Sequence, residues 1–306
     1  MSKKLNKTIF ILLNYNSRPF LKNCLDSLIR QTVKPDKIVV VDNCSTDDSV
    51  KFLEKLYPRI TLVKNKLNLG VGKAFNQAIK KFSHGYNYVA LFNPDIKLDK
   101  NWFKESVKIL ADHPKAEVAA SSNPGKISNI FAGFFVGTTS LSNAQPVFFA
   151  VITAMLIRTS AFKEYGFFDE DYFMYFEDID FCWRVLLGGR KILYAKKAKL
   201  WHFGHGSRPN QKLHLKIHSG AETNLLATYY KNLSAPFLIF LLPILTMARF
   251  LGSLVYLKTD PALTLAKLKA IVFFIFQVLK GGYNRKRFLA QKIRKISDRE
   301  VFVNNV

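Results

Sequence analysis

Short apolar segments alternate with polar clusters along the first hundred residues. Four uninterrupted runs of four to six residues, rich in β-branched and aromatic side chains, stand out: 8–13, 38–41, 60–63 and 87–92. Such runs are typical of strands that are buried on both faces of a parallel sheet. Between them, apolar residues recur at helical spacing after Pro19, after the cluster Ser45–Asp48 and after the turn Asn68–Gly72.

This alternation predicts an α/β domain with a doubly wound, Rossmann-like sheet. Ligands of such sheets bind outside the carboxyl ends of the strands. Polar clusters follow each of the four predicted strands, at 14–17, 42–48, 68–72 and 93–95. We therefore expect the functional site at this edge of the sheet.

The pattern changes in the second half of the chain. Residues 121–148 are rich in Ser, Asn, Gly and Pro and carry almost no charge, which favours a long loop or irregular insertion. A strand-like run follows from about residue 149. No secretory signal is expected, because the apolar run 8–13 has no small-residue cleavage site after it.

Charge narrows the choice of partner. The 306 residues hold 46 Lys and Arg against 22 Asp and Glu, a net charge of +24, which calls for a polyanionic partner or surface. Half of this excess, +12, lies in residues 208–306. No RNA-recognition, zinc-finger or helix-turn-helix pattern is present, so we expect no nucleic acid. The three distant cysteines predict neither a disulfide framework nor a zinc site and fit a cytoplasmic context.

Two polar clusters suit a nucleotide. Asp42 ends a strand and could accept hydrogen bonds from a nucleoside; alternatively, the residues after it merely cap a helix. The sequence Asn68-x-Gly70-x-Gly72 would let backbone N–H groups approach a phosphate or ribose, although a plain tight turn explains it equally well.

Asp95, in Asn93-Pro94-Asp95, is a candidate ligand for a divalent cation bridging two phosphates. An ordinary turn is the alternative. His202 could complete the site, because neutral imidazole is a common metal ligand; His205 is a weaker choice, and both could be surface-loop histidines.

The strongest signal is an acidic segment, residues 169–180, in which six carboxylates are interleaved with aromatic and aliphatic residues. Carboxylates in apolar surroundings can have raised pKa values, which suits a general base. The alternative is a structural role, in which Asp178 and Asp180 pair with Arg184 and nearby lysines.

The order of these motifs resembles the inverting glycosyltransferases of family 2, which have the GT-A fold, and in particular their rhamnosyltransferase-like branch. The resemblance covers roughly residues 7–208. It implies that the donor nucleotide is bound by Asn14, Tyr15, Asp42, Asn43, Asn68, Gly70, Asn93 and Asp95. It implies a divalent cation, Mg²⁺ or Mn²⁺, held by Asp95 and His202, with Asn93 replacing the first Asp of the metal-binding D-x-D motif. Asp178 would be the catalytic base, with Glu177 as the second choice.

The resemblance further implies transfer of a sugar, rhamnose in that branch, from a nucleoside-diphosphate donor to a glycan or polyprenyl-diphosphate-linked acceptor during cell-surface polysaccharide synthesis. A non-catalytic nucleotide-sugar-binding subunit is an alternative, which the intact Glu177-Asp178 pair disfavours. A nucleotidyltransferase would require a glycine-rich loop with a basic residue after the first strand. Asn14-Tyr15-Asn16 does not supply such a loop.

We expect two domains, a GT-A domain at 1–208 and a basic, apolar, helical region at 209–306. Residues 233–257 are long enough to span a membrane, but Pro243 and Arg249 interrupt them, and 270–279 is too short to span. Helices lying in the plane of an anionic membrane are favoured over a span, on the cytoplasmic face. A buried helical subdomain or a dimer interface is the alternative.

Overall fold

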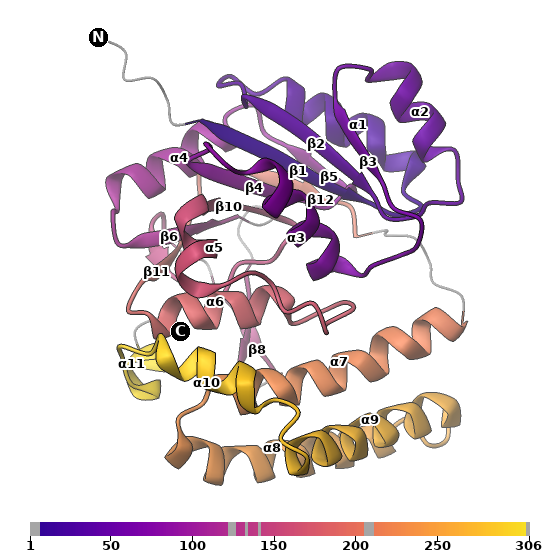
Figure 1. The fold of residues 1–306 in the computed structure, drawn as a ribbon, viewed down its shortest axis with the longest axis vertical. Coiled ribbons are helices and arrows are strands. Elements are labelled where there is room, and N and C mark those ends of the chain that lie inside the picture. The colour runs from indigo at the N-terminus through magenta and orange to yellow at the C-terminus, as the bar shows by residue number, and fades with distance from the viewer. Residues whose placement is uncertain (1–6, 122–126, 132–133, 140–141, 205–210, 304–306) are drawn as a thin grey trace.

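The computed structural model describes residues 7–121, 127–131, 134–139, 142–204 and 211–303 (Figure 1). The strands are β1 (Thr8–Asn14), β2 (Lys37–Asp42), β3 (Thr61–Lys64), β4 (Tyr88–Phe92), β5 (Ile96–Leu98), β6 (Ala116–Ala120), β7 (Ile127–Phe131), β8 (Phe134–Thr139), β9 (Gln145–Pro146), β10 (Ala154–Arg158), β11 (Lys191–Tyr194) and β12 (Leu200–His202). The helices are α1 (Arg18–Ile29), α2 (Ser49–Leu56), α3 (Val71–Phe82), α4 (Trp102–Asp112), α5 (Thr159–Tyr165), α6 (Glu177–Leu187), α7 (Gln211–Asn232), α8 (Ala235–Leu254), α9 (Pro261–Leu279), α10 (Asn284–Lys292) and α11 (Asp298–Val303).

The central sheet has the strand order β3-β2-β1-β4-β10-β6-β11-β9. The first four predicted strands are present and pair in parallel, with β1 between β2 and β4 and with β3 at the edge. Strand β10 runs antiparallel to both of its neighbours, β4 and β6, so the sheet is mixed. This is the Rossmann-like mixed sheet that was expected.

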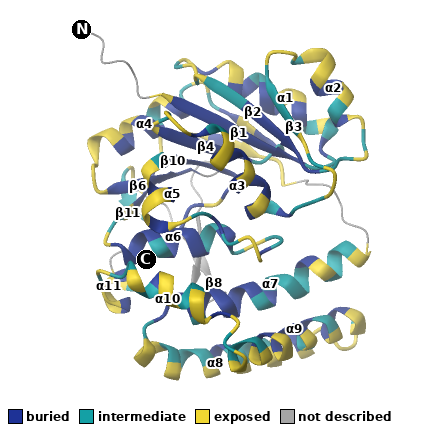
Figure 2. Cartoon of the chain, in the orientation of Figure 1, coloured by how far each residue is buried: buried dark blue, intermediate teal, exposed yellow. Residues whose placement is uncertain are grey.

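The side chains of β1 alternate between two cores. Ile9, Ile11 and Leu13 face the core that α3, α5 and α6 cover, whereas Phe10 and Leu12 face the core beneath α1 and α4. Figure 2 shows the inner strands β1 and β4 as buried along their length. Because helices cover both faces, both sets of side chains are apolar, which explains the uninterrupted runs in the sequence.

One local prediction was wrong. The segment 121–148 is not simply a loop: β7 pairs antiparallel with β8, and β9 joins the edge of the sheet beside β11. The segment has few charges and many small polar residues, but it also contains enough β-branched and aromatic residues to form strands. The Ser45–Asp48 cluster precedes a helix as predicted, because α2 begins at Ser49 with Asp48 at its N-cap position.

The C-terminal helices form layers beneath the sheet domain. Helix α7 packs on α6, and α8 and α9 lie side by side below α7 (Figure 1). The prediction that the second apolar run is too short to span was wrong. Helix α9 has 19 residues because it begins at Pro261, where Asp260 accepts a hydrogen bond from the Leu263 N–H. By length and composition, both α8 and α9 could cross a membrane.

Candidate active site

Asn14 and Asp42 lie opposite each other at the ends of β1 and β2. The Asn14 amide donates to Asp42 Oδ1 at 2.7 Å, and the Ser45 hydroxyl donates to the same oxygen at 2.6 Å. Both Asn14 and Asp42 are buried, and the Asn14 side-chain oxygen has no hydrogen-bond partner within the described residues. That oxygen keeps an unused capacity to accept a hydrogen bond. Tyr15 contributes its carbonyl, which accepts a hydrogen bond from the Ser17 hydroxyl.

Asn43 joins the second strand end to the glycine turn. Its amide donates to Asn68 Oδ1 at 2.8 Å and to the Gly70 carbonyl at 3.2 Å. Gly70 has a φ of +79°, and a Cβ there would lie 2.4 Å from the Phe173 carbonyl oxygen. The turn therefore requires glycine for its backbone conformation and for its approach to the acidic segment.

Asp95 and His202 meet because β5 pairs with β12, which sets Ile96 opposite His202. Asp95 is buried, and its Oδ2 lies 3.1 Å from His202 Nε2. This hydrogen bond raises the pKa of His202. Asn93 lies nearby in the chain, and its backbone N–H donates to the Thr153 carbonyl at 3.2 Å. His205 lies outside the described residues.

The pairing of a carboxylate with an imidazole suits a divalent cation such as Mn²⁺. Across the described ranges, no group of three or more His, Cys, Asp or Glu side chains is arranged to hold a metal. Asp95 and His202 would therefore supply two ligands, and oxygen atoms of a bound diphosphate and of water would supply the others. The donor set fits a cation that binds together with a nucleotide.

Four of the six carboxylates in the acidic segment have structural partners. Asp180 pairs with Lys231 at 2.9 Å and with Arg184 at 3.1 Å. Burial alone would raise the pKa of Asp180, but these two cations lower it. The other three carboxylates also pair with lysines: Asp169 with Lys231 and Lys286, Glu170 with Lys80, and Asp171 with Lys286. The structural alternative is thus correct for Asp180, although Asp178 forms no such pair.

Glu177 and Asp178 form no ion pair with any described residue. They are the first two residues of α6. Asp178 accepts hydrogen bonds from the backbone N–H groups of Ile152 at 3.3 Å and Ile179 at 2.8 Å. Burial raises the pKa of Asp178 to about 6. Burial and the charge of Asp178 raise the pKa of Glu177 well above its usual range. With a pKa of about 6, Asp178 is largely ionised at neutral pH and can accept a proton.

Two sets of contacts bring Asp178 to the edge of the sheet. Phe92 pairs with Ala154, so Asn93 lies beside the segment whose Ile152 N–H contacts Asp178. The Val71 N–H donates to the Phe173 carbonyl at 2.8 Å, which ties the glycine turn to the acidic segment. Residues that were predicted from separate motifs thus converge on one region.

Two contributors from α7 were missed by sequence reasoning. Lys231 pairs with Asp169 and Asp180, and the Asn224 amide donates to the backbone of the acidic segment. Nothing in their local sequence distinguishes them from other polar residues of a helix. Their contacts arise only because α7 packs against α6.

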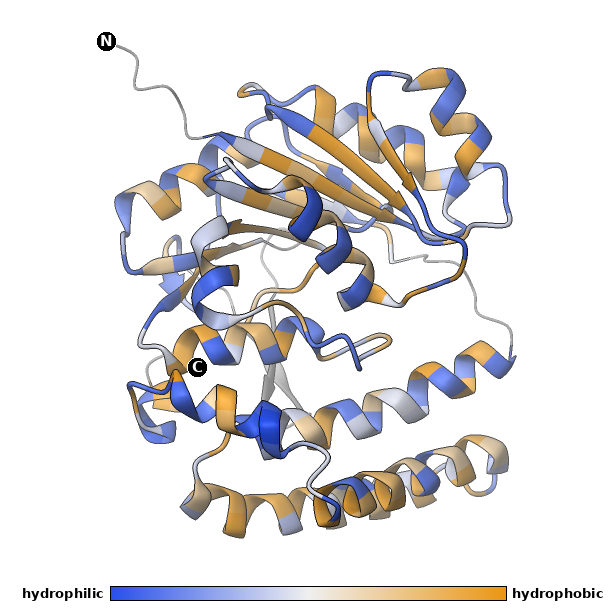
Figure 3. Ribbon diagram, in the orientation of Figure 1, coloured by the Kyte–Doolittle hydropathy of each residue, from blue (hydrophilic) through white to orange (hydrophobic). Residues whose placement is uncertain are grey.

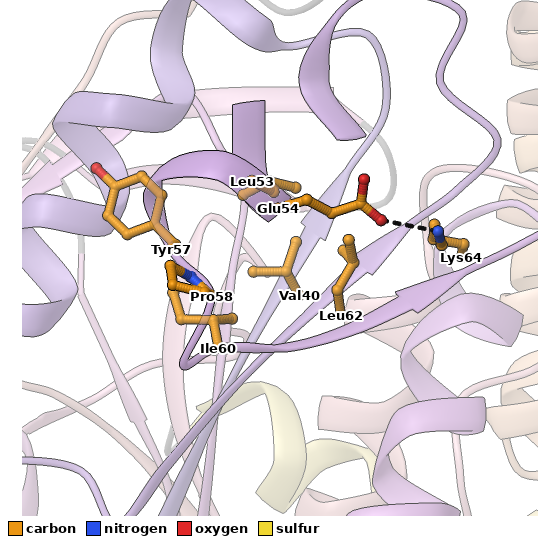
Figure 4. Close-up of a pocket in the computed structure, with 8 residues that line it drawn as sticks. All are labelled: Val40, Leu53, Glu54, Tyr57, Pro58, Ile60, Leu62 and Lys64. Atoms are coloured by element: carbon orange, nitrogen blue, oxygen red, sulfur yellow. Dashed lines mark hydrogen bonds and ion pairs between the residues drawn. The ribbon is translucent and has the colours of Figure 1, made fainter. Parts of the chain in front are cut away.

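A separate pocket of about 280 Å³ lies beside β2 and β3 (Figure 4). Its lining includes Val40, Leu53 and Leu62, and Glu54 pairs with Lys64 across it at 2.9 Å. None of the predicted site residues lines it. This pocket is therefore distinct from the candidate active site.

Comparison with known sequences identifies the family. The sequence profile of glycosyl transferase family 2 matches residues 9–166, just over half of the chain. The chain belongs to glycosyl transferase family 2. This glycosyltransferase is similar to N-acetylglucosaminyl-diphospho-decaprenol L-rhamnosyltransferase of Mycobacterium tuberculosis, with 26% identity over 249 residues, 68% of this chain and 80% of the relative.

Solved structures agree on the fold of the glycosyltransferase. GalNAc-T7, crystallised with UDP, GalNAc and Mn²⁺, superposes with a TM-score of 0.63 at 10% identity, covering 92% of this chain and 58% of that one. The mannosyltransferase PcManGT of Pyrobaculum calidifontis, in complex with GDP-Man and Mn²⁺, superposes with a TM-score of 0.53 at 17% identity, covering 95% and 86%. The chain thus has the GT-A fold of enzymes that transfer sugars from nucleotide donors.

Proposed function

We propose that this glycosyltransferase inverts the anomeric centre of its donor sugar and uses Asp178 as the catalytic base. The observation that carries the proposal is the electrostatic contrast within the acidic segment. Four carboxylates have lysine or arginine partners, whereas Asp178 has only backbone donors and a raised pKa. A carboxylate with a pKa near the working pH, without a neutralising partner, is suited to general base catalysis.

In the proposed reaction, Asp178 accepts the proton of an acceptor hydroxyl as its oxygen bonds to the anomeric carbon. The bond from that carbon to the diphosphate breaks, and the nucleoside diphosphate leaves from the opposite face. One carboxylate is sufficient, in contrast to the carboxylate pair of a glycosidase. Glu177, protonated and buried beside the base, stays neutral and does not compete for the proton.

We assign donor binding to the residues at the strand ends, from Asn14 to Asp95. The Asn14 side-chain oxygen, buried without a described partner, supports a contact with an N–H or hydroxyl of the nucleoside. Asp95 and His202 would hold a divalent cation, which when bound offsets the charge of the leaving diphosphate. The Mn²⁺ that accompanies nucleotides in two structural neighbours supports this assignment.

The proposed acceptor is a glycan on a polyprenyl diphosphate in cell-surface polysaccharide synthesis, and rhamnose is the proposed sugar. The mycobacterial relative supports this proposal, because it transfers L-rhamnose to a decaprenyl-diphosphate-linked N-acetylglucosamine. Such an acceptor lies in a membrane, which agrees with the C-terminal helices. The proposed domain boundary lies at residue 208, and α7, which follows it, contacts the acidic segment.

We further propose that α8 and α9 lie in the plane of the cytoplasmic face of the membrane. Figure 3 shows both helices as largely hydrophobic, and many of their apolar side chains are exposed. Their other faces are held by α7, where Glu222 pairs with Arg249 at 2.5 Å and with Lys267 at 2.7 Å. A span would separate these charges or carry them into hydrocarbon, which is costly. An in-plane position keeps the cluster within the protein.

A donor screen tests the function. Hydrolysis and transfer are measured with UDP-GlcNAc, GDP-mannose and a nucleoside-diphosphate L-rhamnose, each with Mn²⁺, with Mg²⁺ and with a chelator. We expect activity with one donor and a loss of about 10²–10⁴-fold in kcat for Asp178→Asn, with donor binding retained.

Glu177→Gln is the matched control, because glutamine imitates the protonated carboxyl that we infer at that position. We expect it to retain most of the wild-type kcat. Full activity of Asp178→Asn together with an inactive Glu177→Gln variant would reverse the two assignments. Donor binding without hydrolysis or transfer under any condition would favour the non-catalytic nucleotide-sugar-binding subunit.

A further inference from the structure

The backbone turns sharply just before Glu177 and the proposed base, Asp178. Tyr175 and Phe176 have φ values of 70° and 74°, so two consecutive residues with side chains occupy the left-handed region. That region is unfavourable for residues with a Cβ, so the surrounding structure must hold the turn. Glu177 follows directly as the first residue of α6. The direction of the Asp178 side chain therefore depends on this turn.

One side chain of α7, that of Asn224, donates hydrogen bonds to the backbone of this turn. Asn224 is buried, and its Nδ2 donates to the Met174 carbonyl at 3.2 Å and to the Tyr175 carbonyl at 3.0 Å. These carbonyls belong to the two peptide groups on either side of Tyr175. We propose that Asn224 is a positioning residue, which locks the left-handed turn and thereby aims Asp178 at the acceptor hydroxyl. This inference rests on the proposed role of Asp178 as the base.

The neighbouring contacts of α7 fit this role. The hydroxyls of Thr228 and Tyr172 lie 2.9 Å apart, and Lys231 donates to Asp169 at 2.7 Å. Asn224, Thr228 and Lys231 follow the spacing of i, i+4 and i+7, which puts them on one face of the helix. The partners of these three side chains extend from Asp169, at the start of the acidic segment, to Tyr175, in the turn. Among these three side chains, only Asn224 contacts the strained residues themselves.

An amide is well suited to this position. Its NH₂ group has two hydrogens and can donate to two carbonyl oxygens. A carboxylate in the same place would repel the two carbonyl oxygens, and an aliphatic side chain would give them no hydrogen-bond donor. Unpaired buried carbonyls are costly, so the turn would relax toward ordinary backbone angles. Relaxation would move Asp178 away from the Ile152 and Ile179 N–H groups that stabilise its charge.

The test compares Asn224→Leu, which keeps the branched shape and the number of heavy atoms of the side chain, with Thr223→Val. Thr223 lies on the same helix but donates toward Ser219 and Ala270, away from the turn. The substrate is whichever nucleotide sugar in the donor screen the wild-type enzyme uses. We expect kcat to fall about 10²-fold in Asn224→Leu, as for a small misplacement of a catalytic group. The KM for the donor stays within about threefold, and Thr223→Val retains the wild-type kcat.

Two further measurements separate positioning from general loss of structure. The acid limb of the pH–rate profile should move to higher pH in Asn224→Leu, because a displaced Asp178 loses the backbone donors that lower its pKa. Adding Tyr175→Asn should restore part of the kcat, since asparagine tolerates the left-handed region better than tyrosine. If Asn224→Leu does not fold, the smaller Asn224→Ser, which cannot reach both carbonyls, is measured in its place.

The inference is overturned if the folded Asn224 variant retains its kcat within twofold, or if Thr223→Val loses as much. It is also overturned if the acid limb does not move and Tyr175→Asn restores nothing. These outcomes are distinct from failure of the proposed function. That failure would appear in the wild-type enzyme as an absence of hydrolysis and transfer, or in a fully active Asp178→Asn variant.

Discussion

At the scale of single residues, partners distinguish carboxylates that look equivalent in the sequence. Asp178 and Asp180 are two positions apart on α6, yet one has backbone donors and the other has two cations. Because α6 turns by about 100° per residue, these two side chains point in different directions. Asp180 is directed toward α7 and its lysine, and Asp178 toward the segment before β10.

The first prediction concerns the pH dependence of transfer. Asp178 must be ionised to accept a proton, and its pKa is about 6. We expect kcat/KM to rise with pH up to about 6 and then to level off, with a tenfold loss per pH unit below that value. The measurement is a pH–rate profile between pH 4.5 and 8, with protein stability checked at each pH. A residual rate in Asp178→Asn that keeps the same acid limb would contradict the assignment.

The second prediction concerns Gly70. We expect Gly70→Ala to lower the free energy of unfolding and to reduce transfer, because the new methyl would collide with the Phe173 carbonyl. Gly85→Ala is the matched control: Gly85 has nearly the same φ, +80°, but no atom lies within 4 Å of the added Cβ. It should cost only the backbone strain, about 1–2 kcal/mol, and leave transfer unchanged. Equal effects in denaturant unfolding and activity would show that the contact with Phe173 is unimportant.

At the scale of elements, α7 connects the catalytic region to the C-terminal helices. Asn224 and Lys231 contact the acidic segment, and Glu222 pairs with Arg249 of α8 and Lys267 of α9. Both sets of contacts fall within three turns of one helix. The C-terminal layer therefore supports the site through α7.

The third prediction tests the ion cluster in this connection. Glu222→Gln would leave Arg249 and Lys267 without their carboxylate, and removing one partner of a buried pair typically costs 3–5 kcal/mol. Glu54→Gln removes the same charge from an exposed pair with Lys64, for which about 1 kcal/mol or less is expected. Denaturant unfolding of both variants measures the difference. Similar small losses would mean that the cluster does not anchor α8 and α9.

At the scale of the whole molecule, many exposed apolar side chains and half of the net positive charge fall in the same third of the chain. Phe240, Ile244, Val272 and Leu279 are among the many exposed apolar side chains of α8 and α9. The region from 208 onward carries 16 Lys and Arg against four Asp and Glu. Apolar surface with basic residues is the combination that binds anionic lipid interfaces.

The fourth prediction is that the protein sediments with phosphatidylglycerol vesicles. We expect Phe240→Asp and Val272→Asp to weaken this binding, since each places a charge on the apolar surface. Leu67→Asp, at a comparably exposed leucine of the sheet domain, should not. Protein that stays in the supernatant, or an equal loss in the Leu67→Asp control, would contradict the proposed membrane surface.

Cysteine labelling tests whether α8 and α9 lie in the plane of the membrane or span it. In-plane helices keep the α8–α9 connection on the side of the catalytic domain, whereas two spans would carry it across. In a Cys44→Ser background, Thr259→Cys should react with an impermeant maleimide from that side of sealed membranes. Reaction only from the opposite side would favour the span.

The sequence by itself determined the α/β class, the four parallel strands and the motifs at their carboxyl ends, because these depend on local hydrophobic patterns and short spacings. It also marked the acidic segment and the apolar C-terminal runs. Only the tertiary structure decided which acids pair with lysines, that β10 is antiparallel and that β7 pairs with β8. It likewise revealed that Asn224 contacts the turn before Glu177. These features depend on contacts between residues far apart in the chain, which no local pattern encodes.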